Sequence, residues 1–144
     1  MRLCTVIVGS LLLAPGLAAA DLSGIWMGQV PGGRGAVTDI SFQFAQQGEG
    51  LGGKLYEDFG STPLVEGGIE GDQLFFVVVA REQAGNQINL VTYRYEGKAV
   101  EGKLELTRER IKAVDAVSGT EYVLNERPDD EKTEPPKIRL KRLL

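Results

Sequence analysis

The side chains that most often perform catalysis are almost missing from this chain of 144 residues, which contains no histidine and a single cysteine. Nucleophilic catalysis needs a nucleophile in contact with a base, and histidine is the commonest such base. The serines beyond residue 20 offer no substitute, because none is followed by lysine at the third position after it. This composition predicts a protein that is not an enzyme.

The chain also has few side chains that could bind a metal or a cofactor. Tight zinc or copper sites need histidine or cysteine ligands, and calcium needs clustered oxygen ligands. The acidic clusters at residues 57–58 and 129–131 lack the spacing of a calcium loop. We therefore expect no metal and no cofactor. An enzyme that uses carboxylates alone stays open as an alternative, with four glutamates beside glycine turns as its candidates: Glu66, Glu70, Glu96 and Glu101.

The aromatic residues carry more information than the acidic ones. Trp26, Phe42, Phe44, Tyr93 and Tyr95 can share one wall of a β-structure if their side chains point inward. Such a wall would form an apolar pocket in which the tyrosine hydroxyls orient a small ligand. The alternative is that these side chains are simply the core, because each large aromatic buries ~150–250 Å² and a small barrel needs them.

Residues 1–20 have the pattern of a secretory signal. A positively charged start is followed by an apolar run over residues 3–13, and Ala18, Ala19 and Ala20 give the small-residue cleavage pattern. A run of this length is too short to span a bilayer, which needs about 20 residues. We expect cleavage before Asp21, secretion or delivery to a periplasm, no transmembrane segment in the mature chain, and no disulfide, since the only cysteine is Cys4.

From residue 21 onward, apolar residues recur with period two, which is typical of half-buried strands. Of the 19 glycines of the chain, the 17 beyond residue 20 are expected to mark the loops and turns between the strands. Eight strands are predicted, over residues 22–30, 36–46, 51–57, 63–69, 73–81, 88–96, 100–111 and 120–127. No long helical segment interrupts them. The prediction is an all-β fold, a small antiparallel up-and-down barrel whose closure removes every sheet edge; a sandwich is the alternative.

Gly24-Ile25-Trp26 at the start of the first strand, together with an arginine near the end of the last, resembles the lipocalin and calycin signature. More narrowly, residues 22–127 resemble small secreted bacterial lipocalin-like domains of unknown function. The resemblance implies that Trp26 lies at the closed end of the barrel with a late arginine packed over its ring. Arg127 is the matching position, and Arg139 or Arg142 takes its place if the true last strand is 137–143.

The predicted organisation is a signal at residues 1–20, a barrel domain at 21–127, and an acidic-to-basic tail or extra strand at 128–144. The tail is predicted either to dock as a strand, with Ile138, Leu140 and Arg142 on one face, or to contact an anionic envelope surface or an envelope protein. The rest of the mature chain has 10 basic and 16 acidic residues, which excludes a nucleic-acid partner.

Taken together, the sequence predicts an exported, non-enzymatic, calycin-like domain that binds a small apolar ligand or an envelope partner. Two alternatives remain open at this point. One is a structural or interaction module whose barrel is filled by its own side chains, and the other is the enzyme that relies on carboxylates alone.

Overall fold

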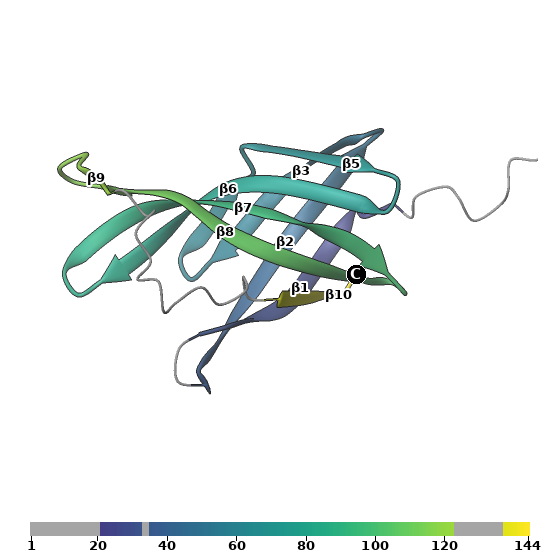
Figure 1. Cartoon of the computed structure of the whole chain (residues 1–144), viewed down its shortest axis with the longest axis horizontal. Helices are drawn as coiled ribbons and strands as arrows, with labels where there is room; N and C mark the ends of the chain where they lie inside the picture. The colour runs from purple at the N-terminus through teal and green to yellow at the C-terminus, as the bar shows by residue number, and fades with distance from the viewer. Residues whose placement is uncertain (1–20, 33–34, 123–136) are drawn as a thin grey trace, which may run out of the picture.

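The computed structural model describes residues 21–32, 35–122 and 137–144. Within them the chain is built almost wholly from β-strands (Figure 1). The strands, in chain order, are β1 (Gly24–Pro31), β2 (Val37–Gln47), β3 (Gly50–Glu57), β4 (Gly60–Pro63), β5 (Glu66–Glu70), β6 (Gln73–Ala84), β7 (Gln87–Val100), β8 (Lys103–Asp115), β9 (Glu121–Tyr122) and β10 (Lys137–Arg142).

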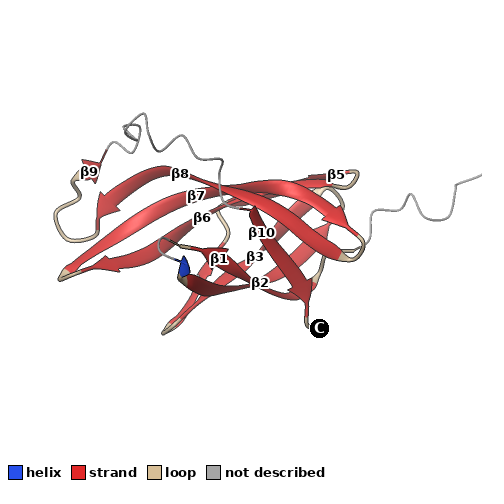
Figure 2. Ribbon diagram, turned by 60° about the horizontal axis from the view of Figure 1, so that its bottom comes forward, coloured by secondary structure: helices blue, strands red, loops and turns tan. Residues whose placement is uncertain are grey.

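Eight of these strands close into an antiparallel barrel, which confirms the predicted fold class. The order around the barrel is β10-β1-β2-β3-β5-β6-β7-β8, and β10 pairs with β8 to complete the ring (Figures 1 and 2). Two short strands lie off this ring, since β4 pairs with β3 and β9 pairs with β8. The strand expected over residues 63–69 is therefore divided between β4 and β5.

The last wall of the barrel comes from the carboxyl end of the chain. β10 inserts between β1 and β8, with Leu140 opposite Gly28 on one side and Leu104 on the other. Ile138 and Leu140 are fully buried, so this segment is the docking strand that was one of the predicted alternatives. The strand expected over residues 120–127 is described only as far as β9, and its remaining residues, 123–127, lie outside the described part of the chain.

The sequence had suggested that the glycines mark loops and turns, but some of them lie inside strands. Gly53 and Gly97 lie inside strands and face the interior, opposite Phe44 and Leu106. A Cβ atom on Gly53 would lie 1.8 Å from a backbone oxygen of β2, and one on Gly97 would lie 1.9 Å from a backbone oxygen of β8. Only glycine permits this approach of neighbouring backbones, which lets the strands bend sharply enough for a small barrel to close.

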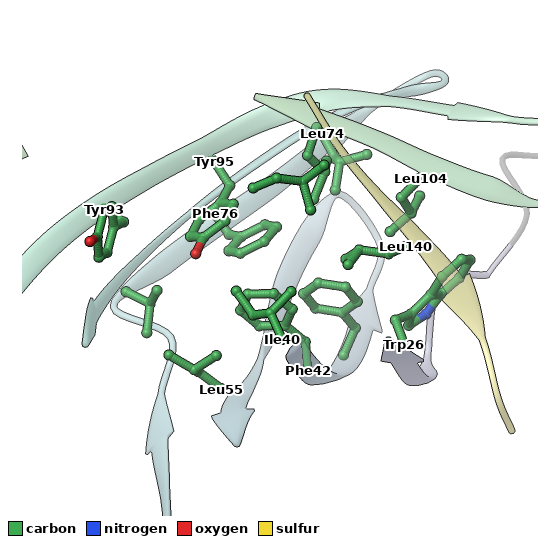
Figure 3. Close-up of a cluster of buried hydrophobic side chains, with 14 of the residues drawn as sticks. Trp26, Ile40, Phe42, Leu55, Leu74, Phe76, Tyr93, Tyr95, Leu104 and Leu140 are labelled. Atoms are coloured by element: carbon green, nitrogen blue, oxygen red, sulfur yellow. The ribbon is translucent and has the colours of Figure 1, made fainter. Parts of the chain in front are cut away.

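The interior is filled by a single apolar cluster, in which aromatic rings dominate (Figure 3). Phe76 stacks on Tyr95 with ring centroids 4.7 Å apart, and it meets Phe42 edge-on at 5.0 Å. Phe44 stacks beside Phe42 at 5.5 Å. These separations are those of closely packed aromatic pairs. The middle of the barrel is therefore core.

The barrel has two different ends, seen at opposite sides of Figure 3. At the Trp26 end, β1 begins, β10 finishes, and the turns at 48–49, 71–72 and 101–102 are found. At the Tyr93 end, β6, β7 and β8 continue as a long curved arm (Figure 2). The two ends carry different polar side chains.

Candidate functional site

The five aromatic residues proposed as a pocket wall all point inward. Trp26, Phe42, Phe44, Tyr93 and Tyr95 are each at most 2% exposed. The structure brings the last four together through ring contacts, while Trp26 lies towards the other end of the cluster (Figure 3). Their rings are buried by packing within the core. Of these five residues, only the two tyrosines bring a hydroxyl group to this part of the interior.

Trp26 and its arginine form a structural closure of one end. The Arg142 guanidinium lies over the indole, 4.8 Å from the ring centroid, and donates a hydrogen bond to the Asp21 carbonyl. The indole Nε1 donates to the Leu22 carbonyl at 2.9 Å. Of the three arginines considered for this contact, Arg142 makes it, and Arg127 lies outside the described residues.

Gly24 belongs to the same closure. Its φ of +136° lies in a region that favours glycine, and a Cβ there would lie 2.2 Å from the Leu144 backbone oxygen. The Ile25 amide donates to that oxygen at 3.1 Å, and the Leu143 amide donates to the Ile25 carbonyl at 2.7 Å. The two ends of the described chain are thus joined by backbone hydrogen bonds.

At the other end, charged side chains lie on the inward faces of the strands and stay partly exposed. Strand register places Arg108 opposite Tyr95 and Arg110 opposite Tyr93, so both arginines share the inward face of β8 with Leu104 and Leu106. Glu82 continues the inward face of β6. We call the group made by Glu82, Tyr93, Tyr95, Arg108 and Arg110 the Tyr93 cluster.

The contacts within the Tyr93 cluster treat its two arginines differently. The Tyr93 hydroxyl donates to one carboxylate oxygen of Glu82, and Arg110 donates to the other at 2.9 Å. The Arg108 guanidinium lies over the Tyr93 ring, 4.2 Å from its centroid. Among the described residues, no carboxylate oxygen lies within 4.0 Å of an Arg108 nitrogen. Arg110 is therefore paired with a carboxylate, whereas Arg108 has no carboxylate partner within the described part of the chain.

Both tyrosines of the cluster are held in the protonated form. Burial, reinforced by the hydrogen bond to Glu82, raises the pKa of Tyr93 well above its ordinary value of 10.0. Burial also raises the pKa of Tyr95, against the opposing effect of the nearby Arg108. At neutral pH the two side chains are hydrogen-bond donors, and neither is suited to act as a base.

Sequence reasoning missed Glu82, Arg108, Arg110 and the buried Phe76. A signal for the arginines was present, because the alternation that begins at Leu104 and Leu106 continues to them. Phe76 lies in the run 74–79, which is apolar at every position, so alternation could not show which of its side chains point inward. In the structure Phe76 is fully buried.

The carboxylates proposed for an enzyme do not gather in the interior. Glu70 and Glu96 line a groove of about 1080 Å³ on the outside of the barrel, together with basic side chains. There Arg94 lies 3.7 Å from Glu96. Glu66 and Glu101 are exposed elsewhere. Glu57 does face inward, but its two oxygens accept hydrogen bonds from the Thr62 hydroxyl and the Arg81 amide.

Two features are absent from the described residues. These residues contain no group of three or more acidic, histidine or cysteine side chains placed to hold a metal ion. They also contain no helix of the length and apolarity needed to cross a membrane.

No family model, no curated protein and no solved structure matches this chain.

Proposed function

We propose that this chain is an exported, non-catalytic binding domain with a lipocalin-like barrel, and that it holds the anionic group of a small, partly apolar ligand at the Tyr93 end. The observation that carries the proposal is the Arg108 guanidinium, stacked at 4.2 Å on an inward-facing ring with no carboxylate partner among the described residues.

The chemistry of Arg108 suits an anion. A guanidinium presents a rigid fork of donors that matches a carboxylate, sulfonate or phosphate. Stacking on an aromatic ring contributes about 0.5–2 kcal/mol and fixes the plane of the guanidinium before a ligand arrives. The protonated hydroxyl of Tyr95 lies next to it and adds a further donor. Preorganised donors favour binding because little side-chain entropy is lost on association.

The apolar part of such a ligand has a surface to contact. The inward layer beyond Tyr93 is formed by three small side chains placed opposite one another, Ala80, Val91 and Ala113. Small side chains fill less volume here than the aromatic rings fill on the other side of Tyr93; Ala80 is partly exposed, whereas Val91 and Ala113 are buried. We infer that the ligand lies in this layer, with its anionic end at Arg108 and no part of it within the packed rings.

Export and the absence of catalysis are parts of the same proposal. Export is supported by the signal pattern of residues 1–20, which lie outside the described residues. A non-catalytic role is supported by the missing histidine and by the hydrogen bonds that occupy both oxygens of Glu82 and of Glu57.

A second candidate function is an interaction module whose barrel is filled by its own side chains. Two observations favour it. The rings of Phe42, Phe76 and Tyr95 fill the middle of the barrel, and Lys137 and Lys141 on β10 are exposed on its outer face. These lysines would serve an anionic envelope surface or an acidic partner protein.

Fluorescence titration with anilinonaphthalene sulfonate separates the two functions, since this probe is an aromatic anion. We expect saturable binding that weakens about tenfold in Arg108→Gln, which corresponds to ~1.4 kcal/mol of lost charge-assisted hydrogen bonding. Arg94→Gln is the matched control, because Arg94 also lies over an aromatic ring, that of Phe75 at 4.6 Å, but on the outer face. Equal affinity of all three proteins would overturn the proposal and favour the filled module.

A further inference from the structure

A groove of about 1080 Å³ runs across the outer face of the barrel, on the side of the sheet away from the core. Five neighbouring strands form its floor, in the order β5-β6-β7-β8-β10. One row of paired positions crosses it, from Gly68 on β5 through Phe75, Glu96 and Thr107 to Lys137 on β10. Neighbouring strands lie ~4.8 Å apart, so this row extends over roughly 19 Å. The groove is therefore long enough for a short chain molecule.

One aromatic ring, that of Phe75, contributes to the floor of the groove and is partly exposed. The ring packs against Gly68 on the neighbouring strand, where a Cβ atom would lie 2.7 Å from the nearest ring carbon. The ring can occupy this place because residue 68 has no side chain. The Arg94 guanidinium lies over the ring, 4.6 Å from its centroid. The ring is thus held between a glycine and an arginine, and it offers an apolar surface to the C–H groups of a ligand.

Acidic and basic side chains alternate along the groove. On the outer face of β7, Glu96 lies between Arg94 and Lys98. Across the sheet, Glu105 on β8 is opposite Lys98 on one side and Arg139 on the other. Each of these glutamates therefore has basic neighbours on both sides, and the charges cancel over the length of a ligand. A ligand with a strong charge of either sign meets repulsion somewhere in the groove, so an uncharged ligand fits it best.

The ion pairs of the groove keep hydrogen-bonding capacity for a ligand. The Nε atom of Arg139 lies 3.8 Å from Oε1 of Glu105, and the Nε atom of Arg94 lies 3.7 Å from Oε2 of Glu96. Both distances exceed the usual range of about 2.7–3.2 Å for a hydrogen bond. A hydroxyl group both donates and accepts, so one that accepts from a guanidinium can also donate to the neighbouring carboxylate. The groove therefore matches a ligand with many hydroxyl groups.

A peptide is the other uncharged chain to consider, and the strand pairing disfavours it. Peptides that bind to a sheet commonly add a strand to a free edge, where backbone groups are unpaired. Where they cross the groove, β6, β7 and β8 are each paired on both sides, so they offer no free edge there. Recognition in the groove is left to side chains, which match the hydroxyl groups of a sugar better than a peptide backbone.

We propose that the outer groove is a binding site for an uncharged oligosaccharide. Its hydroxyl groups bridge Arg139 and Glu105, and the C–H groups of its rings pack on Phe75. This inference goes beyond the proposed function, because the groove lies on the opposite side of the sheet from the Tyr93 cluster. Neither site contributes a side chain to the other, so each can fail while the other stands.

The test uses three tetramers with the same β-1,4 linkage, built from glucose, glucosamine and glucuronic acid. At about pH 5.5 they are neutral, cationic and anionic, while the glutamates of the groove stay ionised. Amide chemical shifts of the ¹⁵N-labelled chain measure the affinity and locate the ligand. We expect the neutral tetramer to shift the amides of Phe75, Glu105 and Thr107 saturably. It should bind at least about threefold more tightly than either charged tetramer, because each charged ring would face a like charge in the groove.

Three results would overturn the proposal. One is the absence of any saturable shift with the glucose tetramer. Another is tighter binding of either charged tetramer, which would make the groove an ion-binding surface. The third is tighter binding of an uncharged, end-blocked tetrapeptide of glycine and serine, which would make the groove a peptide site.

Variants in the groove locate the binding. Phe75→Leu keeps an apolar side chain but removes the ring, and it should weaken binding of the glucose tetramer about tenfold. Glu105→Gln should weaken it about threefold and strengthen binding of the glucuronate tetramer by a similar factor, because Lys98 and Arg139 then lose the carboxylate between them. The fold should tolerate this change, since the Glu105 side chain is 43% exposed.

Glu109→Gln is the matched control for Glu105→Gln. Glu109 lies on the outer face of the same strand, is exposed, and does not line the groove. Its substitution removes an equal charge and should leave both affinities unchanged. If Glu105→Gln and Glu109→Gln altered the affinities for the two tetramers equally, the oligosaccharide would not lie in this groove and the proposal would be wrong.

Discussion

The two ends of the barrel use the same contact for different purposes. Arg142 covers the ring of Trp26 at 4.8 Å, and Arg108 covers the ring of Tyr93 at 4.2 Å. At the Trp26 end the guanidinium also bonds a backbone carbonyl, and the two ends of the described chain meet around it. At the Tyr93 end the surrounding side chains are charged, and Arg108 has no described carboxylate partner. A stacked arginine is therefore structural or available to a ligand according to what else it contacts.

The turns reinforce this difference between the ends. Those at the Trp26 end carry exposed acidic residues, Glu49, Asp72 and Glu101. Those at the Tyr93 end carry Phe59 and Val117, which are 103% and 92% exposed. Asp58 and Asp115 lie in or beside the turns of the Tyr93 end, so acidic residues occur at both ends, and the turns of the Tyr93 end differ by their exposed apolar side chains.

The largest expected effect tests whether the Trp26 end stabilises the fold. Trp26→Ala removes a fully enclosed indole and is expected to lower the free energy of unfolding by about 3–5 kcal/mol. Urea denaturation followed by circular dichroism measures the change. Met27→Ala is the control, since Met27 is the outward neighbour on the same strand and 39% exposed. A loss of stability no larger than that of the control would mean that this end is not the structural one.

The Tyr93 end should reveal itself at alkaline pH. Folding raises the pKa of Tyr93 and Tyr95 above the value of 10.0 that an unfolded chain shows. Stability from these groups is fully present below pH 10 and is lost as the pH rises above it, because the unfolded state then releases protons that the folded state retains. Tyrosinate absorbance near 295 nm in native protein should lag behind that in urea. If both hydroxyls titrated at their ordinary pKa in the native protein, these side chains would be exposed to solvent and the prediction would be wrong.

A smaller effect compares the two stacked arginines directly. Arg142→Gln should lower the free energy of unfolding by about 0.5–2 kcal/mol, the range of a cation–π contact, and it also loses the hydrogen bond to the Asp21 carbonyl. Arg108→Gln should lower the free energy of unfolding by less. The contact of Arg108 with the Tyr93 ring lies at the edge of the core, and no hydrogen bond from Arg108 to a described backbone group accompanies it. Urea denaturation of both variants gives the ranking, and the reverse ranking would exchange the roles of the two ends.

The sequence was sufficient for part of the core and insufficient for Phe76 and the Tyr93 cluster. Period-two alternation predicted that Phe42 and Phe44 point inward, as they do, since one buried face requires it. The same alternation runs through Arg108 and Arg110, but the general tendency of charges to face water outweighed it. A bulge between Thr92 and Tyr93 also shifts the register of β7 against β8, and no residue type announces it.

Closure of the barrel was the least predictable step. β10 pairs with β1 and β8, strands that are distant from it in sequence, through only two fully buried side chains, Ile138 and Leu140. Its basic residues resemble those of a solvated tail. Which strand fills the gap depends on the shape of a barrel that exists only when the other seven strands are in place, and local pattern carries no record of that shape.

The smallest expected effect comes from removing the charge of Glu82, whose carboxylate competes with an anionic ligand for Arg110. Glu82→Gln leaves Tyr93 a carbonyl oxygen to donate to, but it deprives Arg110 of its carboxylate. Stability should change by only about 0–1 kcal/mol, because Arg110 and Glu82 are 42% and 39% exposed. Affinity for anilinonaphthalene sulfonate should rise about three- to fivefold, since two uncompensated guanidinium groups then face the anion.

The control for this last variant is Glu96→Gln, which frees Arg94 on the outer face in the same way. It should leave the affinity unchanged, because Arg94 lies on the opposite side of the sheet from the proposed ligand. A gain in affinity from Glu96→Gln but none from Glu82→Gln would move the site to the outer groove. Weaker binding in Glu82→Gln would show that Glu82 orients the Tyr93 cluster for its ligand, which would make the ion pair with Arg110 part of the binding surface itself.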